Sequence, residues 1–169
     1  MSINDNILGA QNFPIFEERQ TVNIAYMIKT ANKSECVRRK YSAVIISDEN
    51  LVLSVGYNQR VGNCCNNGQC VRNRLNVQHG TNTDSGAEVH AEQAALIYVN
   101  VDSIPRDIYV LGLDENGKIL NGIQSSPCYS CARMIAFAGI LWVCLPVDGK
   151  WGRFSIDDIM ENREKVWEI

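Results

Sequence analysis

The chain has 169 residues and a formal net charge of −3 at neutral pH. This length predicts one domain, residues 1–169, with a single sizeable core. The acidic balance argues against a surface that coats nucleic acid, and no apolar run approaches the length of a membrane span. The first residues do not have the pattern of a secretory signal. We therefore expect a cytoplasmic protein in which the seven cysteines serve metal binding more than disulfides.

Hydrophobic patterning predicts the first elements in chain order. Apolar residues are spread among polar ones through residues 17–33, as expected for a helix that covers a sheet. Residues 42–47 and 51–56 are rich in β-branched side chains and flank Asp48-Glu49-Asn50, a pattern typical of a hairpin. From residue 58 to residue 86 the periodicity fails, and Asn, Gly and Cys are frequent. A loop of that length inside a compact domain is usually functional or is held by something other than packing.

The second half alternates helices and strands. An apolar helical stretch follows His90, a strand is expected at residues 108–113, and a helix and a strand then lead to Val143. Between them, Asp114-Glu115-Asn116-Gly117 is a turn signal. A short helix is expected near the end of the chain. Strands that alternate with helices predict an α/β fold.

Two short motifs carry the chemistry. The first is His90-Ala91-Glu92, and the second is Pro127-Cys128-Tyr129-Ser130-Cys131. His90, Cys128 and Cys131 supply one nitrogen and two thiolates, the ligand set of a catalytic zinc whose fourth position stays open to water. The two cysteines are three residues apart, so at a helix start both sulfurs point to one side. The positive end of the helix also favours the thiolate that a metal requires.

Glu92 is not needed as a ligand, and it stands where a proton carrier is required. Zinc lowers the pKa of a bound water toward ~7. Glu92 would accept the water proton, pass it to the ring nitrogen beside the reacting carbon, and then protonate the departing ammonia. Each motif is weak alone, because C-x-x-C also marks structural zinc and redox pairs, and H-x-E also occurs at ordinary polar helix starts. Their order and the proline favour a catalytic site.

H-x-E followed by P-C-x-x-C is the known signature of zinc-dependent nucleobase deaminases. From about Ala25 to about Val143, the chain resembles the cytidine/deoxycytidylate deaminase superfamily. Four segments of the first half are similar to the deoxycytidylate deaminase branch: residues 34–45, Gly56-Tyr57-Asn58, residues 62–65, and the run from Cys70 to His90. The resemblance implies a three-layer α/β/α cytidine-deaminase-like fold with a central mixed sheet of about five strands.

The sequence departs from that branch in two places. Ala94 stands where the branch has asparagine, and residues 114–122 lengthen the approach to P-C-x-x-C. The tail, from Leu145 to Met160, is similar instead to the cytidine deaminases that act on free nucleosides. These departures leave the nucleotide and the nucleoside readings open.

The resemblance implies hydrolytic deamination of a cytosine nucleotide, dCMP to dUMP and ammonia, in pyrimidine salvage or thymidylate supply. One alternative is a deaminase of free cytidine and deoxycytidine, or of modified or purine bases. Another is a non-catalytic zinc-binding relative, against which the retained Glu92 argues. A polynucleotide editor is disfavoured by the acidic balance. Because members of the family form dimers, tetramers or hexamers, the resemblance also implies a homo-oligomer.

The same resemblance implies substrate contacts. Asn58 would hold the base or the sugar, and the Ala91 backbone and the loop at Ser126 would contact the base. The phosphate of a nucleotide needs cationic or backbone donors. Arg60 follows Asn58 closely and is the first choice. Further candidates are Arg38, Arg39, Lys40, Arg72 and Arg74.

Some deoxycytidylate deaminases hold a second, structural zinc. The resemblance carries its ligands onto Cys36, Cys64 and His79, with Glu88 or Cys70 as the fourth. A loop with few apolar residues can be held by a metal in place of packing. The alternative is that these are buried free cysteines and a surface histidine. We expect two zinc ions per chain.

Overall fold

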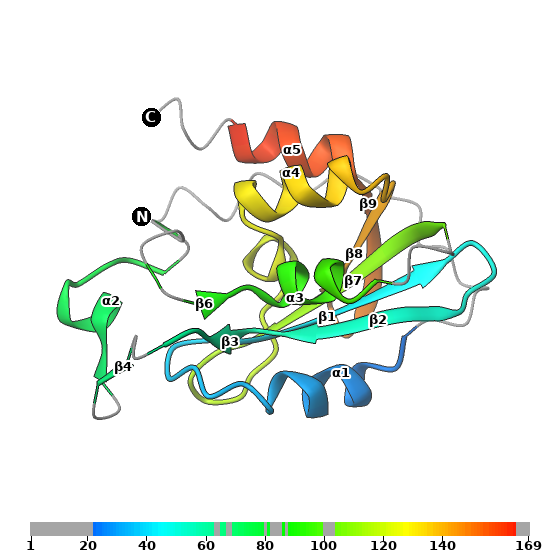
Figure 1. Cartoon of the computed structure of the whole chain (residues 1–169). Coiled ribbons are helices and arrows are strands. Elements are labelled where there is room, and N and C mark those ends of the chain that lie inside the picture. The colour runs from blue at the N-terminus through cyan, green and yellow to red at the C-terminus, as the bar shows by residue number, and fades with distance from the viewer. Residues whose placement is uncertain are drawn as a thin grey trace.

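The computed structural model describes residues 22–62, 65–66, 69–79, 81, 86, 88–99 and 104–164. Its centre is a five-stranded sheet with the strand order β2-β1-β7-β8-β9, shown in Figure 1. The strands are β1 (Lys40–Ser47), β2 (Val52–Tyr57), β7 (Pro105–Leu113), β8 (Trp142–Val147) and β9 (Lys150–Ser155).

The sheet is mixed, as the sequence predicts. Strand β1 is antiparallel to both β2 and β7, so the predicted hairpin of β1 and β2 is present. Strands β7 and β8 are parallel, and β8 is antiparallel to β9. A parallel pair needs a crossover connection, which contains the helix α4 (Tyr129–Phe137). Strands β1 and β7 are buried along nearly their whole length because helices cover both faces.

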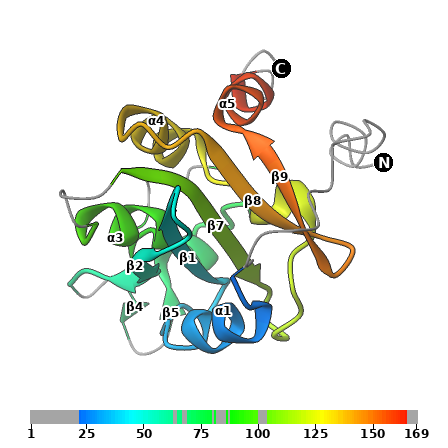
Figure 2. The ribbon, with the colours of Figure 1, turned by 90° about the vertical axis from the view of Figure 1, so that its right-hand side faces the viewer.

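Helices lie on both faces of the sheet, which confirms the three-layer α/β/α prediction (Figure 2). Helix α1 (Ile24–Ala31) covers one face, and α3 (Ala91–Ile97), α4 and α5 (Ile156–Glu164) cover the other. The helix predicted over residues 17–33 is therefore found at its centre, and residues 17–21 lie outside the described residues. Helix α1 starts after Asn23, whose side-chain oxygen accepts hydrogen bonds from the first turn.

The core follows the alternation of the strands. In β1, Ala43 and Ile45 pack on the side of α3, whereas Val44 and Ile46 pack on the side of α1. All four side chains are at most 2% exposed. Two apolar layers therefore hold the sheet between its helices. None of the helices in the described part of the chain has the length and hydropathy needed to span a bilayer.

The stretch from residue 58 to residue 86, predicted to be irregular, contains only short elements where it is described. They are β3 (Gln59–Arg60), β4 (Cys65–Asn66), β5 (Gln69–Cys70) and α2 (Val71–Arg74), and β6 (Glu88–Val89) follows. Figure 1 shows them extending beyond the end of the main sheet. Strand β3 pairs with β6, with Gln59 opposite Val89. The chain that leaves β2 is thereby placed beside the chain that enters α3.

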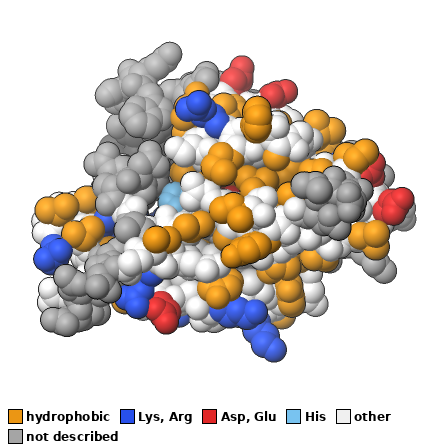
Figure 3. Space-filling view, viewed as in Figure 1, with side chains coloured by type: hydrophobic (Ala, Val, Ile, Leu, Met, Phe, Trp, Pro, Cys, Tyr) orange, Lys and Arg blue, Asp and Glu red, His pale blue; other side chains and the backbone are white. Residues whose placement is uncertain are grey.

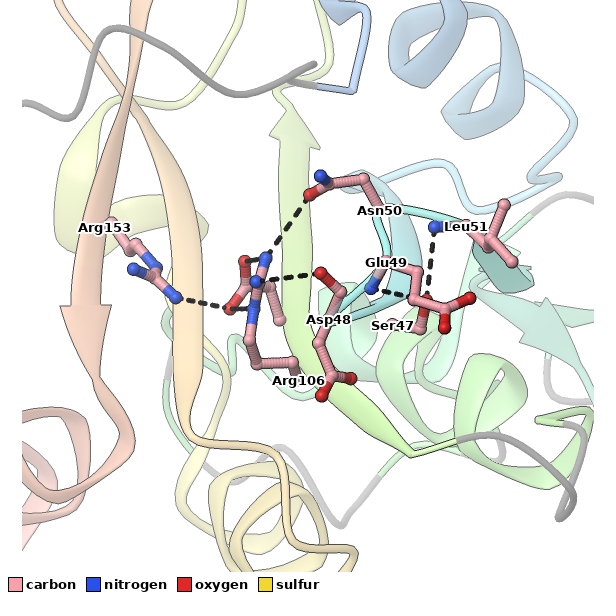
Figure 4. Close-up of polar contacts among 8 residues, drawn as sticks. Ser47, Asp48, Glu49, Asn50, Leu51, Arg106 and Arg153 are labelled. Carbon is pink, nitrogen blue, oxygen red and sulfur yellow. Dashed lines mark hydrogen bonds and ion pairs between the residues drawn. The ribbon is translucent and has the colours of Figure 1, made fainter.

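A buried carboxylate ties the central strand β7 to two other parts of the sheet (Figure 4). Asp107 is 3% exposed and accepts hydrogen bonds from Arg106 at 2.8 Å and from Arg153 of β9 at 2.9 Å. Arg106 also donates to the backbone oxygen of Asp48 and to Asn50 Oδ1, in the turn between β1 and β2. The hairpin, the central strand and the edge strand are thus joined by one polar cluster.

Replacing Asp107 by alanine should lower the free energy of unfolding by ~3 kcal/mol, because removing one partner of a buried ion pair leaves the other charges uncompensated. Urea denaturation measures this change. Glu49→Ala is the control, since Glu49 is exposed in the same turn region, and it should stay within about 0.5 kcal/mol of the wild type. Equal stability of the two variants would contradict the role given to Asp107.

Candidate metal centre

His90 is held at the start of α3 by local hydrogen bonds. It is the N-cap residue, with extended backbone angles. Its backbone N–H donates to Gln93 Oε1 at 2.9 Å, and its carbonyl accepts from the Ala94 N–H at 2.9 Å. Gln93 therefore supplies an acceptor that the helix backbone does not offer at this position. These contacts fix the backbone from which the imidazole projects.

Cys128 and Cys131 occupy the start of α4, as their spacing predicts. Cys128 is the N-cap residue and Cys131 lies in the first turn. His90 Nδ1 is 3.3 Å from Cys131 Sγ and 3.4 Å from Cys128 Sγ. All three ligand atoms lie within 4.8 Å of one another, and among the described residues no other group of His, Cys, Asp or Glu does so. A tetrahedral zinc separates its nitrogen and sulfur ligands by about 3.6 Å, so the spacing fits that ion.

The surroundings of Cys128 favour its thiolate, the form that binds a metal. A hydrogen bond from the Cys131 side chain, followed by the interaction with His90, lowers the pKa of Cys128 to about 3 although burial opposes the shift. The hydrogen bond with Cys128 in turn raises the pKa of His90 to about 9. A bound cation would take the place of the imidazolium proton, because metal ligands bind in deprotonated form.

Glu92 lies beside this cluster in the first turn of α3. It is 5% exposed. After the hydrogen bond with Cys128, the charge of Glu92 is a further cause of the raised pKa of His90, so the carboxylate is close to the imidazole. Glu92 does not belong to the group of three ligand atoms. A buried carboxylate next to a metal site that it does not complete is well placed to carry protons.

Gly56 of β2 allows α3 to approach the sheet closely. A Cβ atom on Gly56 would overlap the carbonyl oxygen of Ala91 and lie 2.5 Å from the backbone nitrogen of Ala95. Ser54, two residues earlier on the same strand, donates to the Ala95 carbonyl at 2.7 Å. The sequence analysis noted Gly56 only as part of the Gly56-Tyr57-Asn58 segment that resembles deoxycytidylate deaminases. Its packing role could have been suspected, because an isolated glycine in a strand often marks a close backbone approach.

The amide of Asn58 is already engaged with the protein backbone. Its Oδ1 accepts from the Tyr41 N–H at 2.7 Å, and its Nδ2 donates to the Arg39 carbonyl at 3.1 Å. Asn58 is 5% exposed. One N–H and one lone pair of the amide remain for a substrate. The side chain therefore anchors the start of β1 in addition to any contact with a ligand.

Of the other predicted substrate contacts, Ala91 and Ser126 lie at the starts of the two helices, whereas Arg60 does not. Ala91 is fully buried at the first position of α3, and Ser126 is 8% exposed just before Pro127. Arg60, the first choice for the phosphate, instead forms an ion pair with Glu35, with 2.6 Å between Nη2 and Oε2. Its positive charge is therefore shared with an exposed carboxylate of the protein itself.

The residues predicted to hold a second zinc are only partly brought together. The pKa of Cys36 is raised, chiefly by burial and to a smaller extent by the nearby Glu88 carboxylate, so these two side chains are neighbours. Cys70 is buried and His79 is exposed. Cys64 lies outside the described residues. Cys36, Cys70, His79 and Glu88 do not by themselves bring three ligand atoms within 4.8 Å of one another.

Two side chains that no motif indicated hold the segment in front of Pro127. The Ser125 hydroxyl donates to the Leu120 carbonyl at 2.6 Å and accepts from the Gly112 N–H at 3.1 Å. The Tyr41 hydroxyl donates to the Gln124 carbonyl at 3.0 Å. These contacts join the extra segment at residues 114–122 to β7 and β1. They fix the approach to Cys128.

Comparison with known proteins gives a match over most of the chain. Residues 17–145 match the family model described as the cytidine and deoxycytidylate deaminase zinc-binding region. A deoxycytidylate deaminase of Mycobacterium phage D29 is 32% identical over 122 residues, which are 69% of this chain and 84% of that protein.

Solved structures of deaminases are also similar to this chain. The cytidine deaminase of Burkholderia pseudomallei has a TM-score of 0.50 at 16% identity, over 82% of this chain and 96% of that chain. This likeness bears on the arrangement of helices and strands and not on the substrate. The dCMP deaminase of the cyanophage S-TIM5, in complex with dCMP and dUMP, has a TM-score of 0.46 at 22% identity, over 82% and 89% of the two chains.

Replacing Cys128 by serine should remove one zinc ion per chain, because a hydroxyl is a far poorer ligand than a thiolate. Elemental analysis of purified protein gives the count, and loss of a bound ion should also lower the melting temperature. Cys144→Ala is the matched control: burial raises the pKa of the Cys144 thiol to about 12, and it lies outside the cluster. Unchanged zinc in Cys128→Ser would exclude this cysteine as a ligand.

Proposed function

The chain belongs to the cytidine and deoxycytidylate deaminase family, and we propose that it catalyses the hydrolytic deamination of a cytosine nucleotide, with dCMP as substrate and dUMP and ammonia as products. One observation carries the proposal. His90, Cys128 and Cys131 converge on one point, and the buried Glu92 stands beside them without completing the ligand group. A purely structural metal site has no use for that carboxylate.

The residues of the site divide the chemistry between them. His90 Nδ1 and the two thiolates would hold a zinc ion, which would supply the Lewis acidity that activates water as a nucleophile. Glu92 accepts a proton from the attacking water at its carboxylate and delivers it to the ring nitrogen beside the carbon that bears the amine. The same carboxylate then takes the proton of the hydroxyl group now on that carbon and gives it to the amine, which leaves as ammonia. Because Glu92 is buried, it exchanges its proton with the substrate in preference to bulk water.

Support for dCMP comes from the name and the coverage of one relative. The phage D29 protein is named a deoxycytidylate deaminase, and it matches 69% of this chain at 32% identity. In the proposed complex, the Ala91 backbone and the Ser126 loop contact the base. Asn58 contacts the base or sugar with the N–H and the lone pair that the backbone of β1 leaves unused.

A free-nucleoside or modified-base deaminase is the second candidate. It is favoured by Ala94, by the extra segment at residues 114–122, and by the tail of β8, β9 and α5 that resembles nucleoside deaminases. A non-catalytic zinc-binding relative is the third candidate, and the retained Glu92 argues against it.

A homo-oligomer is proposed from the exposed apolar side chains of α3 and α4. Phe137 at the end of α4 is 96% exposed, and Met134, Ile97 and Tyr98 are also exposed. Figure 3 shows hydrophobic side chains spread over the face that carries these two helices. Large exposed apolar surfaces of this kind often mark sites where another protein binds. A second copy of the chain would cover this surface.

The cytoplasmic location stays a prediction.

The second zinc is proposed at Cys36 and Glu88, because the Glu88 carboxylate is close enough to contribute to the raised pKa of the Cys36 thiol. His79 and Cys64 would complete it, or Cys70 in place of Glu88. The zinc count of the wild-type protein decides this proposal. Two ions per chain, falling to one in Cys36→Ser, would support it, and one ion per wild-type chain would remove it.

The substrate is tested by incubating zinc-loaded protein with cytosine nucleosides, their monophosphates, and free or modified bases while ammonia release is followed. We expect release from dCMP and not from deoxycytidine. Release from deoxycytidine alone would establish the second candidate. If zinc-loaded protein releases no ammonia from any of these compounds, the third candidate, a non-catalytic zinc-binding relative, would be established.

Replacing Glu92 by glutamine should lower kcat at least ~10²-fold, the usual contribution of general acid–base catalysis. The zinc content should stay that of the wild type, because Glu92 is not a ligand in the proposed site. Glu49→Gln, in an exposed turn, controls for the loss of one negative charge. Near-normal turnover by zinc-loaded Glu92→Gln would reject Glu92 as the proton carrier.

A further inference from the structure

Three arginines carry guanidinium groups that the described residues do not satisfy. Arg38 is 7% exposed, and its Nη2 donates to the Val77 carbonyl at 2.7 Å. Its Nη1 is buried and has no hydrogen-bond partner within the described part of the chain. The same holds for the Nε atoms of Arg39 and Arg72. Among residues with described side chains, no carboxylate lies within ion-pair distance of any of the three.

These arginines belong to one cluster. Val77 joins two of them, because its carbonyl accepts from the Arg38 side chain and its N–H donates to the Arg72 carbonyl at 2.9 Å. The guanidinium of Arg72 also donates to the Thr81 carbonyl. The pKa of nearby His79 is lowered by burial first and then by the charges of Arg39, Arg38 and, more weakly, Arg72. All three positive charges therefore act on one short stretch of chain.

The cluster costs free energy unless something else accepts its hydrogen bonds. A buried N–H of a charged group without an acceptor forfeits its hydration, and like charges in one place repel. Burial and then the charge of Arg38 lower the pKa of Arg72, which records both effects. The charge of Glu88 opposes this lowering of the Arg72 pKa. Glu88 is also engaged with Cys36, so the three guanidiniums have donors to spare.

The cluster lies next to the parts of the chain that form the metal centre. The Arg39 carbonyl accepts from Asn58, which is proposed to contact the substrate. Glu88 is two residues before His90, and its charge contributes to the pKa shifts of both His90 and Arg72. Arg60 is the nearer arginine in sequence to Asn58, but it is paired with Glu35. Arg153 also has a buried Nε without a partner, but Asp107 pairs with its charge, so among the described residues Arg38, Arg39 and Arg72 combine an unpartnered nitrogen with no ion-paired carboxylate.

We propose that Arg38, Arg39 and Arg72 bind the phosphate of a nucleoside monophosphate whose base reaches the His90, Cys128 and Cys131 site. The planar fork of a guanidinium matches the oxygens of a phosphate, which accepts several charged hydrogen bonds at once. This inference rests on the proposed function and names the residues that select a nucleotide over its nucleoside. These three arginines replace Arg60 as the first choice for binding the phosphate.

A cavity of about 350 Å³ is lined by Arg38 and Lys40 but not by Arg39 or Arg72. Glu35, Asp114 and Glu115 also line this cavity, so three carboxylates oppose an anion there. The proposed phosphate position is therefore beside the three arginines and not in this cavity. Lys40→Gln separates the two locations.

Binding of the product pair dUMP and deoxyuridine, measured by calorimetry on zinc-loaded protein, tests the proposal without requiring turnover. The wild type should bind dUMP at least ~10-fold more tightly than deoxyuridine, the usual worth of hydrogen bonds to a charged group. Arg72→Gln should lose at least ~10-fold in dUMP affinity and keep its affinity for deoxyuridine. Arg74→Gln, an exposed arginine in the same short helix α2, should stay within about 2-fold of the wild type.

Kinetics give the second readout. In Arg72→Gln, kcat/KM for dCMP should fall at least ~10-fold, while any activity on deoxycytidine stays unchanged. Arg38→Gln should act in the same direction, and its melting temperature is measured because Arg38 also holds Val77. If that variant does not fold, Arg72→Gln and the wild-type comparison of dUMP with deoxyuridine still decide.

Equal wild-type affinity for dUMP and deoxyuridine would overturn the proposal while leaving a nucleoside deaminase intact. If Arg74→Gln or Lys40→Gln lost as much affinity for dUMP as Arg72→Gln, the assignment to these three arginines would be overturned. Absence of any deamination with zinc bound would refute the proposed function. In that case a preference for dUMP that Arg72→Gln abolishes would still establish the phosphate site.

Discussion

The contact between His90 and the two cysteines of α4 is what the rest of the molecule maintains. It joins residues 38 and 41 positions apart in the chain, and neither helix could hold it alone. Helix α3 reaches the contact because Gly56 lets its first turn lie against β2. Helix α4 reaches it because it lies within the crossover that the parallel pair of β7 and β8 requires. The sheet thus serves as the frame that brings two helix starts to one point.

Polar side chains around the site form most of their hydrogen bonds with the sheet and the segments next to it. Asn58, for example, holds the start of β1, and Ser125 holds the segment before Pro127. Asp107 does the same for the opposite end of the sheet through Arg106 and Arg153. Buried polar groups that are satisfied by the protein rigidify it, because any movement would break charged or buried hydrogen bonds. A hydrolytic site with one proton carrier needs surroundings that keep the reacting groups in place.

The arginines differ in whether their charge is already paired with a carboxylate of the protein. Arg60 is paired with Glu35, and Arg153 lies over the Trp142 ring at 4.2 Å while it binds Asp107. Arg38 and Arg72 instead donate to backbone carbonyls, which neutralise no charge. Their positive charge remains for a ligand. Position along the chain therefore predicts an arginine's role less well than the partners it meets in the fold.

The amino-acid sequence by itself determined the local features. The three-residue spacing of Cys128 and Cys131 places both sulfurs at one helix start, and β-branched runs on either side of residues 48–50 form a hairpin. Such features depend on residues within a few positions of one another, so pattern and spacing suffice. Tertiary structure alone decided that Asn58 anchors β1, that Gly56 admits α3, and that Arg60 pairs with Glu35. Those outcomes depend on contacts between segments far apart in the chain, and a guanidinium or an amide bonds to whichever group the fold brings within reach.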